Sequence, residues 1–292
     1  MDKILIATMY DDTVRMYVAD TTNTVKRAHE LHQTMQTSIA ALGRTLTATS
    51  MMGAMLKDDQ TIAVQIQGDG PIGKIVAESD ASGNVVGYCG NPGIYLKYNK
   101  TGKLNVRDAV GTTGTLSVTT DLKLKEPFTS SVELIDGEIA MDFTYYFTQS
   151  MQTPSSVSLG VLVSEDNQVL VSGGFIIQIM PNCTDETITK LEEILGNIKP
   201  MSTMLAEQMS CEDIIKLISD DYKLLEEKHV EFKCRCSKKS FKRGLRTLSV
   251  GFLEDLLNNE KSIECKCQYC GTAYVIEEME LKAMVNVLKG DI

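Results

Sequence analysis

TIAVQIQGDGPIGKIVAESDASGNVVGYC, residues 61–89, contains three runs in which apolar and polar residues alternate. This alternation is typical of half-buried strands. The runs cover 61–67, 73–79 and 85–89, and they are separated by Gly-Asp-Gly-Pro and Asp-Ala-Ser-Gly-Asn, both of which are turn sequences. Short turns between successive strands predict an antiparallel meander.

The segments on either side of the meander extend it into an α+β domain over residues 1–180. Residues 3–19 alternate around a turn at Asp11-Asp12 and predict a hairpin. Helical spacing at 25–32 and 37–56 predicts two helices, of which the second is apolar nearly all round and should be buried. Another helix is expected at 137–149 with Asp136 as its cap. Further strands are predicted at 116–122, 132–135, 157–163 and 169–180.

The segment 181–230 differs in composition from the domain before it. Residues 182–230 hold 11 acidic residues and 5 lysines, and apolar residues recur at helical spacing around 188–195 and 214–218. Ser210 and Asp213 have the spacing of a capping box. We interpret 181–230 as an acidic, amphipathic helical linker whose apolar face lies on a neighbouring domain.

Residues 231–292 carry two close cysteine pairs, Cys234-Arg-Cys236 and Cys267-Gln-Tyr-Cys270-Gly271. Two turns that each present two thiolates meet the needs of tetrahedral zinc. Gly271 permits the positive φ that such a turn tends to require. A strand at 273–276 and a closing helix at 278–288 should follow. These 62 residues are too polar to form a large core, so we predict a small zinc-binding domain with one Zn²⁺ per chain.

Two neighbouring residues offer other ligand sets. Cys265 makes a second CxC with Cys267 and is a competing thiol, while His229 could complete a Cys₃His site. The basic run between Lys233 and Arg246 has seven cations and no acid, and three interpretations stay open: a solvated face, a nucleic-acid patch, or cations that stabilise the thiolates.

Length and charge exclude several classes of protein. A chain of 292 residues with 43% apolar and 23% charged residues is neither a disulfide-stapled miniprotein nor disordered throughout. Its net charge of −10 argues against general affinity for nucleic acid. We expect no signal peptide and no membrane span, and therefore a cytoplasmic protein. In that reducing compartment the eight cysteines indicate metal or redox chemistry.

The Gly68-Asp-Gly-Pro-Ile-Gly73 sequence fits a dinucleotide fingerprint and the start of a P-loop. Ile75 replaces the hydroxyl that holds magnesium, Pro71 removes an N–H group, and a strand follows where a helix is needed. We therefore interpret it as a hairpin turn and expect no use of ATP. Hydrolase and metalloprotease signatures do not occur in the sequence, so no enzyme activity is expected.

The chain resembles one bacterial family over nearly its whole length, the redox-regulated heat-shock chaperones of thirty-three kilodaltons. The resemblance rests on the cysteine pattern, the Gly68–Gly73 turn and several further motifs. These are Gly137-Glu-Ile-Ala, Tyr145-Tyr-Phe-Thr-Gln-Ser150, Gln152-Thr-Pro-Ser155 and Gly173-Gly-Phe-Ile-Ile-Gln178.

This resemblance implies an ATP-independent holdase that is inactive while reduced and zinc-bound. Oxidation would convert the four ligands to the disulfides Cys234–Cys236 and Cys267–Cys270 and release zinc. The C-terminal domain would then unfold, the linker would lose its docking, and a homodimer would bind unfolding client proteins. Cys265 departs from the family pattern and puts the second disulfide in question. A zinc-ribbon nucleic-acid protein and a thiol-disulfide oxidoreductase are the alternatives.

Overall fold

The computed structural model describes residues 1–260 and 262–289 and has the predicted α+β class. The chain divides into two compact units, Met1–Lys233 and Cys234–Ile292. The three helices between residues 181 and 230 are part of the first unit. Each unit is described by itself below. No helix among the described residues is both long enough and apolar enough to cross a membrane.

The predicted meander forms the centre of a six-stranded sheet in the first unit. The Gly68–Gly73 sequence joins its first two strands as a hairpin turn. Gly68 is required there, because a Cβ atom at that position would lie 2.0 Å from the carbonyl oxygen of Val110. In sheet order the strands are β11 (Glu231–Phe232), β5 (Asn84–Cys89), β4 (Lys74–Asp80), β3 (Thr61–Gly68), β6 (Gly114–Asp121) and β7 (Phe128–Glu133).

Strand β7 begins earlier than the sequence predicted. The expected strand was 132–135, and the observed one starts at Phe128. Hydroxyl pairs across β6 and β7 extend the ladder, with Ser117 and Ser131 Oγ atoms 2.8 Å apart and Thr119 and Thr129 Oγ1 atoms also 2.8 Å apart. Such polar cross-strand pairs stabilise a sheet. They do not produce the alternation of apolar and polar residues from which the strand was predicted.

A second sheet of five antiparallel strands contains the predicted N-terminal hairpin. The segment 222–229 was predicted to be helical, and this was wrong, because it forms strand β10 paired with β1. Most of its side chains are exposed, so backbone pairing along the edge of β1 defines this strand rather than burial of an apolar face. In sheet order the strands are β10 (Tyr222–His229), β1 (Lys3–Met9), β2 (Val14–Asp20), β9 (Val169–Ile179) and β8 (Ser155–Val163).

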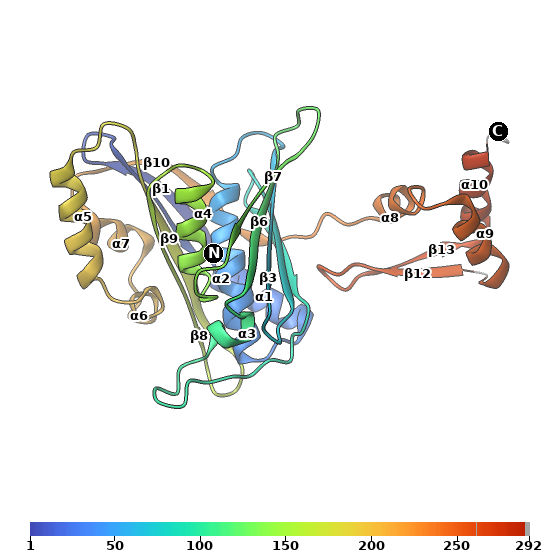
Figure 1. Cartoon of the computed structure of the whole chain (residues 1–292), viewed down its shortest axis with the longest axis horizontal. Helices are drawn as coiled ribbons and strands as arrows, with labels where there is room; N and C mark the ends of the chain where they lie inside the picture. Colours follow the sequence, from blue (N-terminus) through green and yellow to red (C-terminus); the bar gives the residue numbers. More distant parts are fainter. Residues whose placement is uncertain (261, 290–292) are drawn as a thin grey trace. The chain divides into compact units, whose positions relative to one another are not determined.

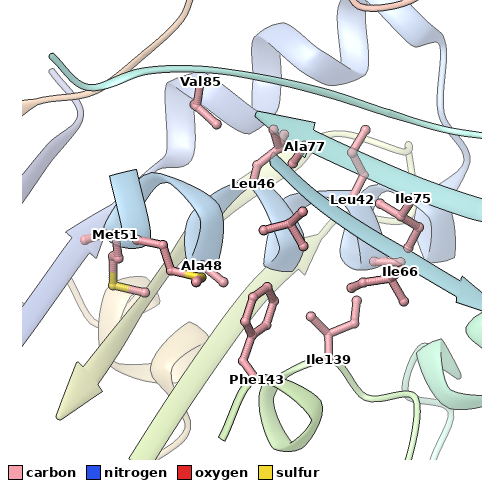
Figure 2. Close-up of a cluster of buried hydrophobic side chains, with 14 of the residues drawn as sticks. Leu42, Leu46, Ala48, Met51, Ile66, Ile75, Ala77, Val85, Ile139 and Phe143 are labelled. Carbon is pink, nitrogen blue, oxygen red and sulfur yellow. The ribbon is translucent and has the colours of Figure 1, made fainter. Parts of the chain in front are cut away.

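Helix α2 (Gln36–Gly53) forms the centre of the main core, as its all-round apolar sequence predicted. Every residue of α2 except Arg44 is buried. Leu42 and Leu46 lie near side chains of the six-stranded sheet, and Phe143 of α4 approaches from the other side (Figure 2). Helices α1 (Thr22–His32), α3 (Val106–Val110) and α4 (Ala140–Gln149) complete this layer.

Asp136 is not the cap of α4, contrary to the sequence prediction. The helix begins at Ala140, and Asp142 in its first turn takes the capping role. The Asp142 carboxylate accepts hydrogen bonds from the backbone N–H groups of Ile135 and Ile139 at 2.7 and 2.9 Å. The chain turns back before the helix, with positive φ at Gly137 and Ile139, and therefore wraps its donors around Asp142.

Three helices cover the other face of the five-stranded sheet, as Figure 1 shows. They are α5 (Asp185–Asn197), α6 (Met201–Ala206) and α7 (Cys211–Ile218), so helix formation is confirmed for this part of 181–230. Their buried side chains share a second apolar cluster with strands β1, β2 and β9. The predicted capping box is present, since Ser210 and Asp213 exchange hydrogen bonds at 3.0 and 3.1 Å.

The second unit contains a two-stranded sheet and three helices among its described residues. The strand and closing helix predicted after Gly271 are both present, as β13 (Ala273–Glu277) and α10 (Glu278–Lys289). Strand β12 (Ser262–Lys266) pairs with β13. The helices α8 (Lys238–Leu245) and α9 (Val250–Asn259) were not predicted. The core of this unit is a small cluster around Ile276, Leu281 and Met284.

Candidate metal centre

Four cysteines of the second unit meet at one point. Cys234 and Cys236 lie in the extended segment before α8, and Cys267 and Cys270 lie in the turn between β12 and β13. Their sulfur atoms all lie within 4.8 Å of one another. The two cysteine pairs that the sequence singled out are therefore brought together by the fold.

The local backbone explains how each pair is presented. The N–H of Gly271 donates to the carbonyl oxygen of Cys267 at 2.8 Å, and the N–H of Cys267 donates to Thr272 O at 2.9 Å. Gly271 has a φ of +72°, which an L side chain rarely adopts. Ser237 caps α8 through its bond from the N–H of Ser240, so the helix begins directly after Cys236.

The sulfur geometry fits a tetrahedral metal. With zinc–sulfur bonds of about 2.3 Å, neighbouring sulfurs of a tetrahedron lie about 3.8 Å apart. Here the Cys234 and Cys267 sulfurs are 3.6 Å apart, and those of Cys236 and Cys270 are 3.4 Å apart. Four thiolates in this arrangement are a donor set suited to zinc.

The thiols differ in their electrostatic surroundings. Burial raises the pKa of Cys234 and of Cys267. Burial acts in the same direction on Cys270, but hydrogen bonding to the Thr272 hydroxyl and N–H groups and to Cys236 lowers its pKa to about 7. Metal binding to this set must therefore displace protons from at least the first two sulfurs, and metal affinity should rise with pH.

Tyr274 is a residue of this centre that the sequence analysis missed. Its hydroxyl oxygen lies 3.3 Å from the Cys236 sulfur and donates to the Cys236 carbonyl oxygen at 3.2 Å. The contact with Cys236 raises the pKa of Tyr274 to about 12. The ring also packs against Phe241 of α8, with centroids 5.4 Å apart. A tyrosine in a short strand carries no sequence signal of such a role.

Two alternative ligands do not join the cluster. Cys265 packs against the apolar cluster of Ile276, Leu281 and Met284. Burial raises its pKa. His229 belongs to β10 of the first unit, and its Nδ1 lies 3.1 Å from the carbonyl oxygen of Asp2. The structure therefore favours neither the register with Cys265 nor a Cys₃His set.

The basic run near the cysteines is partly neutralised. Lys238 and Lys242 both form ion pairs with Glu280 of α10, at 2.6 and 2.9 Å. Hydrogen bonds from these two lysines lower the pKa of Glu280 to about 2. Lys233, at the start of the run, pairs with Glu231 at 3.0 Å.

Comparison with known proteins agrees with this architecture. A model of the family described as Hsp33 protein matches residues 2–277. The chain is 45% identical to the 33 kDa chaperonin of Bacillus pumilus over 285 residues, which is 97% of this chain and 98% of that protein. It is 44% identical to the 33 kDa chaperonin of Bacillus subtilis, again over 97% and 98% of the two chains.

A solved structure gives the same result. The crystal structure of the 33 kDa chaperonin, a heat shock protein 33 homologue, from Thermotoga maritima superimposes with a TM-score of 0.88. Its sequence is 34% identical, and the match covers 99% of both chains. Fold and site together define an α+β protein with a separate four-cysteine unit. The chain belongs to the Hsp33 family.

Proposed function

We propose that this protein is a redox-regulated, ATP-independent holdase chaperone that is inactive while its four cysteines hold zinc. The observation that carries the proposal is the convergence of four thiol sulfurs within 4.8 Å in a unit with a very small core. The chaperonin names of its relatives support the chaperone activity. No catalytic step on a client is part of this proposal.

Zinc bound by Cys234, Cys236, Cys267 and Cys270 supplies folding free energy to the second unit. Structural zinc sites have apparent binding free energies of about 10–16 kcal/mol, which exceeds what a small core contributes. Loss of the ion should therefore unfold this unit. The donor set and the sulfur spacing support zinc as the ion.

Oxidation would remove the ligands and the ion together. Two thiolates form one disulfide and give two electrons to an oxidant such as a peroxide, which takes up two protons and is reduced to two waters, or to one alcohol and one water. Two such events consume all four ligands, and Zn²⁺ leaves as a free ion. Oxidation is in this way converted into unfolding.

We propose that the disulfides are Cys234–Cys236 and Cys267–Cys270. Proximity in the folded state does not select them, because sulfur contacts of 3.6 and 3.4 Å also run between the two pairs. Partners separated by one or two residues stay close after the ion has left, since closing a short loop requires little chain ordering. Disulfides within the pairs also leave the unit free to unfold, whereas disulfides between the pairs would staple it.

The regulated element in this proposal is the segment 181–230, acting as a linker between a chaperone domain of residues 1–180 and a switch domain of residues 231–292. Helices α5 to α7 bury an apolar cluster against the five-stranded sheet. Their release after oxidation would expose that cluster and the sheet face to unfolding clients, and would permit a homodimer. We place this activity in the cytoplasm, where thiols stay reduced until stress.

The oxidoreductase alternative finds little support. Its reactive CxxC should open a helix, as in thioredoxin-like proteins. The Cys267–Cys270 turn instead leads into strand β13.

The test follows zinc, free thiols and aggregation of an unfolding client in the same sample, before and after peroxide at raised temperature. We expect one zinc per chain and no protection in the reduced protein, then zinc loss, two disulfides and protection without ATP. Cys267→Ser should bind zinc weakly and protect clients without oxidant. The matched control is Cys183→Ser, which removes a partly exposed thiol of the first unit.

Three results would contradict the proposal. They are absence of stoichiometric zinc from the reduced protein, equal protection by reduced and oxidised protein, and wild-type zinc affinity in Cys267→Ser.

A further inference from the structure

The four sulfurs take their hydrogen-bond partners from different parts of the chain. Hydrogen bonds from backbone N–H groups act on three of them and oppose the effect of burial on the pKa: from Cys236 on Cys234, from Cys270 and Tyr269 on Cys267, and from Thr272 on Cys270. The Cys236 sulfur lies 3.3 Å from a side-chain oxygen, the phenol of Tyr274, and 3.4 Å from the Cys270 sulfur.

The backbone next to Cys236 is engaged elsewhere. The N–H of Ser237 donates to Ser240 Oγ at 3.0 Å, and the N–H of Ser240 donates back to Ser237 Oγ at 3.2 Å. These reciprocal bonds close the capping box at the start of α8. The N–H of Ser237, the first backbone donor after Cys236, is therefore engaged in the helix cap.

Tyr274 reaches Cys236 from a different element. It lies in β13, opposite Cys265 of β12, so the hairpin that carries Cys267 and Cys270 also carries this phenol. The hydroxyl contacts both the sulfur and the carbonyl oxygen of Cys236, and the ring packs on Phe241 four residues after Ser237. One side chain therefore joins the two halves of the cysteine cluster.

We propose that Tyr274 is a positioning residue of the metal centre, whose hydroxyl fixes Cys236 against the hairpin and donates a hydrogen bond to its sulfur in the thiolate form. This inference rests on the proposed zinc-binding function. The phenol has one proton, for which the Cys236 carbonyl oxygen and the Cys236 sulfur are both acceptors within reach. A metal-bound thiolate can only accept hydrogen bonds and is a stronger acceptor than a neutral carbonyl group, so in that state the phenol proton is shared with the sulfur. Donors in this second layer stabilise the ligand and tune its reactivity.

Removal of the hydroxyl should weaken metal binding and accelerate oxidation. A thiolate that loses a hydrogen-bond donor holds more electron density on sulfur and is a better nucleophile. Loss of such a donor typically reduces metal affinity by about 10- to 100-fold. Because this part of the unit is partly exposed, we expect a reduction of about tenfold, at the lower end of that range.

The test compares full-length wild type with Tyr274→Phe, which keeps the ring and removes only the hydroxyl. Zinc affinity is measured by competition with a chromophoric chelator, and thiol oxidation of the zinc-loaded protein is followed with peroxide. Replacing zinc by cobalt gives a spectroscopic measurement, the sulfur-to-cobalt charge-transfer band. This band should not change if the Tyr274 side chain contributes only by packing. Loss of a hydrogen bond to sulfur should shift the sulfur-to-cobalt charge-transfer band of Tyr274→Phe to longer wavelength.

Two further proteins separate the hydroxyl from packing. Phe241→Leu removes the stacking ring and keeps the phenol, so its charge-transfer band should stay at the wild-type position. Incorporation of 3-fluorotyrosine at position 274 makes the phenol a stronger donor and should shift the band to shorter wavelength. This second substitution keeps the inference testable if Tyr274→Phe fails to fold.

Failure of this inference differs from failure of the proposed function. If wild type binds zinc tightly and the charge-transfer band is unchanged in Tyr274→Phe and in the 3-fluorotyrosine protein, Tyr274 has no positioning role, although the metal centre itself is supported. Wild-type zinc affinity in a folded Tyr274→Phe would also overturn the inference. If wild type binds no metal, the proposed function itself is wrong.

Discussion

The two units of this chain differ in how much apolar surface they bury. In Met1–Lys233, two sheets and the helices between and beside them bury large apolar clusters that include Phe143, Phe147 and Phe175. In the described part of Cys234–Ile292, the main cluster is built on Ile276, Leu281 and Met284. The first unit buries enough apolar surface to fold on its own. The second unit has only a small apolar cluster, together with a group of four cysteine sulfurs that could hold a metal ion.

This contrast explains why a switch would be located in the second unit. Hydrophobic burial is spread over many side chains and responds little to one chemical event. A metal centre concentrates its contribution in four bonds, which two successive two-electron oxidations can remove. The region with the smaller core is therefore the region whose stability can be regulated.

Removal of zinc should give the largest effect. With a strong chelator under reducing conditions, the second unit should lose most of its structure, because binding free energies of about 10–16 kcal/mol are withdrawn. Residues 1–180 of the first unit should keep their exchange protection, whereas α5 to α7 should exchange faster, because the proposed function releases them when the second unit unfolds. Domain-resolved hydrogen exchange measures both at once.

Unchanged exchange in α8 to α10 after zinc removal would show that the small apolar cluster is sufficient. That outcome would break the comparison between the two units.

A core truncation in the first unit should have the complementary effect. Phe143 is fully buried against the main cluster, and Phe143→Ala should destabilise the first unit by about 3–5 kcal/mol. Zinc content and the exchange of α8 to α10 should not change. Denaturant unfolding of the zinc-loaded protein gives the first quantity, and metal analysis gives the second. Loss of zinc from this variant would mean that the two units are not stabilised separately.

How far the fold could be predicted depended on the kind of stabilisation. Apolar periodicity identified the meander at 61–89 and the buried helix α2, because these elements are defined by which face enters the core. It failed for β10, whose exposed side chains carry no such pattern. It failed also for the cap of α4, where the carboxylate lies inside the helix and the chain folds back to meet it.

The candidate site shows the same division. Cysteine spacing identified Cys234, Cys236, Cys267 and Cys270, because ligand chemistry restricts residue type and spacing. The contact of Tyr274 with Cys236 could not be predicted, since it depends on the register between β12 and β13 and on the direction in which α8 leaves the cluster. Side-chain contacts between distant segments carry no local sequence signature.

Cys265 offers a sharper test of which sulfurs matter, with a moderate effect. Cys265→Ser should retain one zinc, because this thiol packs on the apolar cluster and lies outside the group of four. It should destabilise the second unit by about 1 kcal/mol, since a hydroxyl replaces a partly buried sulfur.

Peptide mapping of oxidised Cys265→Ser should show the Cys267–Cys270 disulfide in a larger fraction of molecules than in wild type. The comparison variant is Cys267→Ser, which should lose the metal. A loss of zinc from Cys265→Ser would reassign the ligand set.

The smallest effect concerns the helices that we propose as the linker. Lys3 of β1 lies 2.8 Å from Glu212 of α7, and the hydrogen bond from Lys3 lowers the pKa of Glu212 below its usual value of 4.5. A depressed carboxyl pKa stabilises the folded state above the unfolded pKa, and this contribution is lost as the pH falls through the folded pKa. Both side chains are about one-third exposed, so the pair should contribute only about 0.5 kcal/mol.

The neighbouring thiol of Cys211 is buried and reports opening of α7. Its modification by a dithiodipyridine, which reacts in acid, is measured by mass spectrometry of the Cys211 peptide in wild type and Glu212→Gln. The variant should react about twofold faster at pH 7, and the difference should shrink as the pH falls below 4.5. If the difference in modification rate between wild type and Glu212→Gln stays the same in acid, the ion pair does not stabilise α7. The helix would then be held only by its packing against the apolar cluster of β1, β2 and β9.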